Sequence, residues 1–333
     1  MAGRLSAILI GAITFASISY LIAYNDYQQR VQANASKKAE YQYASLAEPV
    51  KSGAEEIAAN SLSLQKMDLS AIEPAAGKLP EKFYDEDNPV RYKRNASPVP
   101  LHANKAYIAL VIDDLGVIEE LSQRAVDELP PEITMSFLPY GDSTLELAVQ
   151  AREENHEIMI HLPMEALANR EGEYPDPGEN ALTSELSDKE ITELVQENLF
   201  SLKSIAVGIN NHMGSKFTAD LDKMKLVMKA IEKEQLFFLD SLTTNQSVGR
   251  KAAQGLNIPF VARDIFIDHV KDKQAIRQQL DKLTEQALKR GYAIGIGHPH
   301  EKTLDVLKVW LDEIAQRDDI QLIPITTTLK WQK

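Results

Sequence analysis

Short apolar runs alternate with amphipathic stretches along the chain from residue 105 onward. The short runs predict strands at Tyr107–Ile112, Ile133–Phe137, Glu157–Ile160, Ala206–Ile209, Leu236–Leu239, Ile258–Ala262, Tyr292–Ile296 and Ile320–Ile323. Between them, apolar residues at helical spacing, as at Ile191, Leu194, Val195 and Leu199, predict helices, and one helix is expected to begin at the capping box Ser187–Glu190. Such alternation is typical of a parallel sheet. We therefore expect an α/β fold, a distorted (β/α) barrel of seven to eight parallel strands over residues 105–333, with an open doubly wound sheet as the alternative.

The first 104 residues follow a different pattern. No residue from Leu5 to Asn25 is charged, and a helix of that length can cross a hydrocarbon core. We interpret residues 1–25 as a signal anchor or signal peptide that exports the rest of the chain. The nearby Ala33–Ala35 pattern lies further from the apolar run than a cleavage site usually does, which favours an anchor. Residues 26–104 keep no apolar period and contain several prolines, so we expect a largely disordered linker or stalk, through which a protein partner could also bind.

The composition of the chain excludes several classes of function and of metal site. The chain has 333 residues, of which 44% are hydrophobic, enough for one domain with appendages. Its net charge of −13 argues against nucleic acid as a partner. The absence of cysteine excludes disulfides, thiolate zinc sites and a cysteine nucleophile, and it leaves Asp, Glu and His as metal ligands.

Most predicted strands are followed by polar residues that can bind metal or carry protons. In chain order these are Asp113 and Asp114, His161 and Glu165, Asn210–His212, Asp240, Arg263 and Asp264, and His298. The carboxyl ends of barrel strands meet at one end, where the active sites of such enzymes lie. The chain has no G-x-S-x-G elbow and no glycine-rich phosphate loop, which argues against a serine hydrolase and against nucleotide binding.

These residues resemble the motifs of a known family. The pair Asp113–Asp114 and a late strand ending in His298 resemble the NodB-type polysaccharide deacetylases, carbohydrate esterase family 4. Four motifs are most similar in sequence to the divergent, YibQ-like branch of that superfamily: Ile112–Gly116, His161–Glu165, Asn211–Ser215 and Gly297–Pro299. The resemblance covers about two thirds of the chain.

The resemblance implies a divalent metal, usually zinc, that activates water to hydrolyse an N-acetyl group on a sugar. It assigns the general base to Asp113 and metal ligation to Asp114 and His161. The family's second histidine, four positions after the first, is replaced here by Glu165. We expect His212 to supply the missing ligand, with Glu165 either as a further ligand or as a solvent-facing loop carboxylate.

The same chemistry follows from the residue types. A metal held by Asp114, His161 and His212 could activate water and polarise a carbonyl, while Asp113 takes the proton of the water. His298 could protonate the leaving nitrogen if a carboxylate such as Asp264 keeps it cationic, and Asp240 could hold either histidine in its working tautomer. Purely structural roles stay open, such as a helix cap for one carboxylate of the pair or a strand-end carboxylate for Asp240 and Asp264.

Two functions remain. The first is a metal-dependent hydrolase, most simply a Zn²⁺ enzyme, that deacetylates an N- or O-acetylated glycan of the bacterial envelope. The second is a catalytically weak or inactive barrel that binds envelope glycan or a protein partner. Both place the domain in the periplasm, anchored to the inner membrane by residues 5–25 if that segment is retained.

Overall fold

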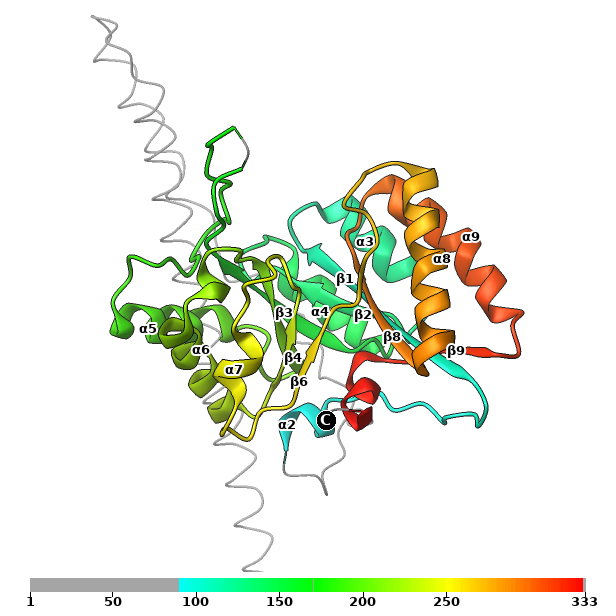
Figure 1. Ribbon diagram of the computed structural model, residues 1–333, viewed down its shortest axis with the longest axis horizontal. Helices are drawn as coiled ribbons and strands as arrows, with labels where there is room; N and C mark the ends of the chain where they lie inside the picture. Colours follow the sequence, from blue (N-terminus) through cyan, green and yellow to red (C-terminus); the bar gives the residue numbers. More distant parts are fainter. Residues whose placement is uncertain (1–89, 170, 332–333) are drawn as a thin grey trace, which may run out of the picture. The chain divides into compact units, whose positions relative to one another are not determined.

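The computed structural model describes residues 90–169 and 171–331 (Figure 1). In this part of the chain all strand pairs belong to one sheet and are parallel. The strands are β1 Ala106–Leu115, β2 Thr134–Phe137, β3 Ile158–Met164, β4 Ala206–Met213, β5 Phe237–Asp240, β6 Phe260–Ala262, β7 Ile265–Phe266, β8 Tyr292–Gly297 and β9 Ile320–Leu322. Each predicted strand is present, and the sequence missed only β7, which has 2 residues.

The sheet is curled into an incomplete barrel. Its order is β6-β5-β4-β3-β2-β1-β8-β7, with β9 added beside the start of β1. The two edge strands, β6 and β7, are joined by only Arg263 and Asp264. Because consecutive Cα atoms are about 3.8 Å apart, this connection spans at most about 11 Å, so the two edges must lie near each other. The prediction of a parallel α/β barrel is thus confirmed at the level of a curled sheet, and the open doubly wound alternative is wrong.

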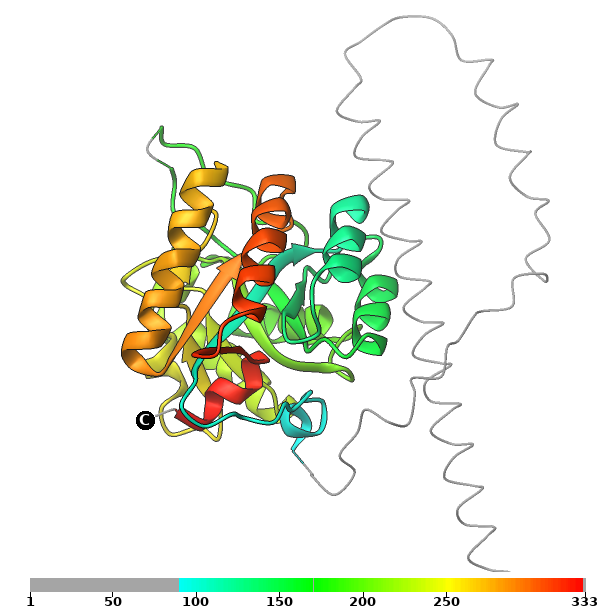
Figure 2. The ribbon, with the colours of Figure 1, turned by 90° about the vertical axis from the view of Figure 1, so that its right-hand side faces the viewer.

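Helices cover the outside of the curled sheet. The longer ones are α3 Glu119–Glu128, α4 Thr144–Glu153, α5 Asp188–Leu199, α6 Leu221–Glu234, α8 Lys273–Arg290 and α9 Glu301–Ala315; the shorter ones are α2 Arg91–Arg94, α7 Gly249–Ala253 and the 3-10 helices η4 Phe217–Ala219 and η5 Ile325–Trp331. Figure 2 shows α8, α9, α3 and α4 side by side around the strands. The predicted capping box starts α5: Ser187 Oγ accepts the Glu190 N–H, and Glu190 accepts the Ser187 N–H.

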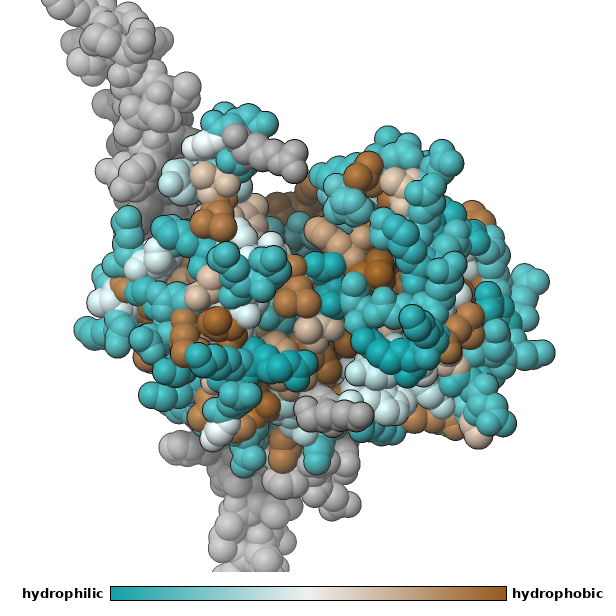
Figure 3. All heavy atoms as spheres, viewed as in Figure 1, coloured by the Kyte–Doolittle hydropathy of each residue, from teal (hydrophilic) through white to brown (hydrophobic). Residues whose placement is uncertain are grey.

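Strand alternation divides the core into two parts. On β1, Ile108, Leu110 and Ile112 pack outward against the helices, whereas Ala109 and Val111 point into the barrel. Residues from the other strands, including Met159, Phe237 and Ile296, complete the interior. Figure 3 shows that the outer faces of α8 and α9 are mainly hydrophilic, as expected for helices that bury one side. Alternation therefore also decides which polar residues at the strand ends face the barrel axis.

Segments from both ends of the described chain close the base of the barrel, where the strands begin. The Asn95 amide donates to the carbonyls of Ser204 and Ala206 at the start of β4. Trp331 stacks on Tyr107, the second residue of β1, and on Tyr292, the first residue of β8. Residues 90–104, expected to be linker, are thus part of the folded domain.

The expected anchor at residues 1–25, and the expected linker as far as residue 89, lie outside the described residues. Among the helices that the structure describes, none combines the length and the apolar character needed to span a membrane.

Candidate metal and hydrolytic site

Asp113 and Asp114 both reach the site because the backbone of β1 departs from regular strand geometry between them. In a regular strand, neighbouring side chains point to opposite faces. Asp113 continues the inward series of Ala109 and Val111, so Asp114 would point outward. Asp114 instead has φ 60°, in the left-handed region that residues other than glycine rarely adopt. The two consecutive carboxylates therefore contact the same cluster.

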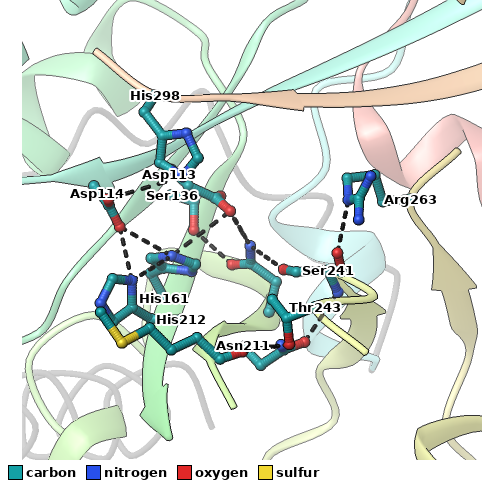
Figure 4. Close-up of polar contacts among 12 residues, drawn as sticks. Asp113, Asp114, Ser136, His161, Asn211, His212, Ser241, Thr243, Arg263 and His298 are labelled. Atoms are coloured by element: carbon teal, nitrogen blue, oxygen red, sulfur yellow. Dashed lines mark hydrogen bonds and ion pairs between the residues drawn. The ribbon is translucent and has the colours of Figure 1, made fainter. Parts of the chain in front are cut away.

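Asp114, His161 and His212 bring three ligand atoms together (Figure 4). Asp114 Oδ1 lies 2.8 Å from His212 Nδ1 and 3.2 Å from His161 Nε2, and the two imidazole nitrogens are 3.2 Å apart. Burial opposes ionisation of Asp114, but the two imidazoles outweigh it and hold the pKa of this carboxyl well below its usual range. This carboxylate is therefore ionised at neutral pH.

The triad fits a divalent metal. Zinc bonds to nitrogen and oxygen are about 2.0–2.2 Å long, so two ligand atoms of one tetrahedral ion lie about 3.3 Å apart, close to the separations in this cluster. Asp114 Oδ1 is enclosed and, among the described residues, accepts no hydrogen bond of proper geometry despite its two close nitrogen neighbours. One carboxylate oxygen and two imidazole nitrogens that converge at these distances are the donor set expected of a zinc site.

Asp113 lies below the triad in the barrel interior. Its carboxylate is 2% exposed, with Oδ2 3.6 Å from His161 Nε2, and it accepts two hydrogen bonds from Asn210 Nδ2, at 2.8 and 2.9 Å. Burial raises the pKa of Asp113, and the nearby histidines and Asn210 only partly offset this effect. A buried carboxylate made more basic by its surroundings is suited to accepting a proton.

His298 faces Asp114 from the opposite side of the cluster. Its Nε2 lies 3.8 Å from Asp114 Oδ2, and its Nδ1 lies 2.9 Å from Asp268 Oδ1. Burial disfavours protonation of His298, but the hydrogen bond to Asp268 and the charges of Asp114, Asp268 and Asp113 outweigh it and raise the pKa of His298 to about 9. His298 is therefore protonated at neutral pH in this arrangement.

The carboxylate that holds His298 is Asp268, not Asp264 as the sequence predicted. Leu110 on β1, Gly295 on β8 and Ile265 on β7 are neighbours in register. Three residues further along each strand come Asp113, His298 and Asp268, at the carboxyl ends of the strands. Asp264 precedes β7 and instead binds Arg290 and the Ile294 N–H. The error arose because β7 was not recognised, so Asp264 was placed at a strand end when it lies at a strand start.

Asp240 and Glu165 also lie outside the cluster. Asp240 follows Leu239, which points into the barrel, so its own side chain points outward and accepts hydrogen bonds from Ser247 Oγ and the Leu242 N–H. The expected contact with a histidine is absent. Glu165 binds Lys216 Nζ at 2.7 Å and accepts the Ser184 N–H, which fixes the β3–α5 loop. Neither carboxylate belongs to the groups of described residues that could hold a metal.

Two residues that contact the cluster were given no role from the sequence: Asn210 was named only among the polar strand-end residues, and Asp268 was not among those residues. Asn210 has the same strand parity as His212, so a site role for His212 implies that the Asn210 side chain points to the same side of the sheet. Asp268 offered no comparable signal, because a strand of 2 residues leaves no periodicity to read.

Comparison with known proteins identifies the same family as the sequence motifs around Asp113, His161, His212 and His298. The profile of the divergent polysaccharide deacetylase family matches residues 110–329. The chain is 35% identical over 230 residues to the uncharacterized protein YibQ of Escherichia coli (strain K12), and this alignment covers 69% of each chain. It is 32% identical over 217 residues to an uncharacterized protein of Haemophilus influenzae, and that alignment covers 65% of this chain and 74% of the relative. The crystal structure of an uncharacterized Agrobacterium tumefaciens C58 protein superposes with a TM-score of 0.67 at 26% identity, over 73% of this chain and 96% of that one. The chain therefore belongs to the divergent polysaccharide deacetylase family.

Proposed function

We propose that this protein is a metal-dependent hydrolase that removes an acetyl group from an N- or O-acetylated glycan of the bacterial envelope. The observation that carries the proposal is the convergence of Asp114, His161 and His212 beside a buried Asp113, with His298 on the opposite side. The family supports a glycan as the substrate class.

The residues divide the reaction as follows. A divalent cation, most simply Zn²⁺, held by the triad would lower the pKa of a water and polarise the acyl carbonyl. Asp113 accepts a proton from the water while the water oxygen forms a bond to the carbonyl carbon. His298 donates its Nε2 proton to the departing nitrogen as the C–N bond breaks, which yields acetate and a free amine. Asp268 keeps His298 protonated and fixes the orientation of its ring.

The same geometry weighs against the inactive-barrel alternative. That alternative rested on Glu165 in place of the family's second histidine. His212, from the neighbouring strand β4, lies where a third ligand is needed, so the substitution at 165 need not remove the metal. Glu165 itself is engaged by Lys216 and Ser184.

Metal analysis and acetate release test the proposal together. We expect the purified full-length protein to bind one Zn²⁺ per chain and to release acetate from N-acetylated chitooligosaccharides or isolated peptidoglycan. His212→Ala should lose both the metal and the activity, whereas Asp113→Ala should keep the metal and lose activity. His102→Ala, an exposed histidine outside the cluster, is the matched control. Wild-type protein without stoichiometric metal, or a His212→Ala variant that binds zinc normally, would contradict the proposal.

We further propose that the catalytic domain is exported and works in the periplasm, held at the inner membrane by residues 5–25. The uncharged run in that segment supports this placement. Fractionation of cells that produce the full chain, followed by protease accessibility of the domain in spheroplasts, tests it. A domain found in the cytosolic fraction would overturn it.

A further inference from the structure

A layer of buried polar side chains, among them Asp113, Ser136 and Ser241, lies beside the metal triad (Figure 4), and Asn210 bonds all three of these residues. Asn210 Nδ2 donates to both oxygens of Asp113, at 2.8 and 2.9 Å, and lies 3.3 Å from Ser241 Oγ. Asn210 Oδ1 accepts a hydrogen bond of 2.6 Å from Ser136 Oγ. The four residues come from β4, β1, β2 and the end of β5, so the layer ties together strands from across the barrel interior.

The chemistry of these groups leaves Asn210 one orientation. An ionised carboxylate only accepts hydrogen bonds, so the amide must present its nitrogen to Asp113. Its oxygen then faces Ser136, whose hydroxyl must donate. Asn210 and Ser136 are fully buried, and all side-chain polar atoms of Asn210 have partners. A buried network with every member satisfied is rigid, because any rotation leaves a polar group without a partner.

We propose that Asn210 is a positioning residue for the reaction: it holds the carboxylate of Asp113 in the orientation in which that group accepts the proton of water, and Ser136 locks the amide that does so. This inference rests on the proposed function. Since one nitrogen bonds both carboxylate oxygens, Asp113 cannot turn about its terminal bond without losing a contact. Asp113 Oδ2 is thereby kept on the side of His161 and the triad.

The neighbouring Asn211 provides a matched control on the same strand. Asn211 is also buried, but it faces away from Asp113: its Nδ2 donates to the Met213 carbonyl at 2.8 Å, and its Oδ1 accepts the Ser241 N–H at 2.9 Å. Truncation of either asparagine removes a buried amide and its hydrogen bonds. Only truncation of Asn210 frees the carboxylate.

The experiment compares Asn210→Ala and Asn210→Leu with Asn211→Ala in the full-length protein loaded with zinc. Leucine keeps the branching of asparagine at Cγ without its polar atoms, so it avoids the cavity that alanine leaves. The readouts are kcat and KM for 4-nitrophenyl acetate and an N-acetylated chitooligosaccharide, zinc content and the unfolding temperature. We expect both Asn210 variants to lose about 10²-fold in kcat, the scale of general base catalysis, with KM and zinc content unchanged. Asn211→Ala should lower the unfolding temperature comparably and affect kcat far less.

The possible failures are distinguishable. Equal losses of kcat in the Asn210 and Asn211 variants, or loss of zinc from the Asn210 variants, would show that Asn210 only supports the fold, and would overturn this inference while leaving the hydrolase intact. A zinc-loaded wild type that cleaves neither substrate would overturn the proposed function, and this role with it.

Discussion

The buried Asp268 and the half-buried His298 form a pair in which the carboxylate touches the histidine twice. Asp268 Oδ1 lies 2.9 Å from the ring Nδ1, and Asp268 Oδ2 accepts the backbone N–H of the same histidine at 2.8 Å. Thr303 Oγ1 donates to Oδ2 as well. The carboxylate thus fixes both the backbone and the ring of His298, which leaves Nε2 as the nitrogen that faces the metal triad.

Asp268→Asn should weaken His298 as an acid. Loss of the negative charge lowers the pKa of His298, and because only protonated His298 can donate, activity should be lost at lower pH than in the wild type. We expect kcat for an N-acetylated glycan to fall by about 10²–10³-fold near pH 8, the scale of general acid catalysis. Cleavage of 4-nitrophenyl acetate, whose leaving group needs no proton, should fall much less. The pH profiles of the two substrates provide the measurement.

Asp264→Asn is the control for that experiment. Asp264 binds Arg290 rather than His298. Its substitution should therefore leave the alkaline limb of the profile where it is, and a shift as large as that of Asp268→Asn would contradict the assignment of the pair.

Glu165→Gln should retain one zinc per chain. The carboxylate contacts Lys216 and Ser184 rather than the triad, so we expect a small loss of stability from the weakened charged hydrogen bonds and no change in metal stoichiometry. Lys216→Met breaks the same ion pair from the other side and should match this result. Zinc analysis and urea unfolding measure the metal content and the stability of the variant. A Glu165→Gln protein without bound zinc would show that Glu165 is a metal ligand after all.

Stability should fall in mild acid because of His156. Burial lowers the pKa of His156, whose Nδ1 lies 2.7 Å from the Ile133 carbonyl, so the unfolded chain binds a proton more readily than the folded one. The free energy of unfolding should therefore decrease as pH falls below about 6.5, the ordinary pKa of histidine. Urea unfolding between pH 5 and pH 8 should show a shallower dependence for His156→Gln. Identical slopes would mean that His156 takes up no proton on unfolding.

Asn95→Ala should destabilise the base of the barrel. The substitution leaves the Ser204 and Ala206 carbonyls without the amide that now bonds them, and we expect a cost of about 1–3 kcal/mol. Zinc affinity should not change, because the site lies at the other end of the strands. Urea unfolding and zinc titration measure the two quantities, and an unchanged stability would show that residues 90–104 are dispensable to the domain.

The sequence predicted the parts of this protein that repeat a pattern and missed those that break one. Apolar runs located the longer strands, and polar residues at their ends identified Asp113, Asp114, His161, His212 and His298, which the structure brings together. Position along the chain alone could not separate Asp240 and Asp264 from the residues that join the cluster. Strand parity turns Asp240 outward, and the two-residue strand β7 moves Asp264 to a strand start.

The left-handed backbone of Asp114 was likewise beyond sequence reasoning. No pattern of apolar positions reports a φ of 60° at one aspartate. That single angle places two consecutive carboxylates on one cluster, and the tertiary contacts of the cluster must stabilise it.

The closure of the barrel base by Asn95 and Trp331 has a consequence for how the molecule can be held. Both described ends of the chain lie at the base of the barrel, where the strands begin (Figure 1), while the triad lies at the opposite, carboxyl ends of the strands. A tether fixed at residue 90 or at residue 331 would therefore hold the domain by the base of the barrel. The strand ends that carry the triad would then face away from the attachment, open to a polymer far larger than the domain itself.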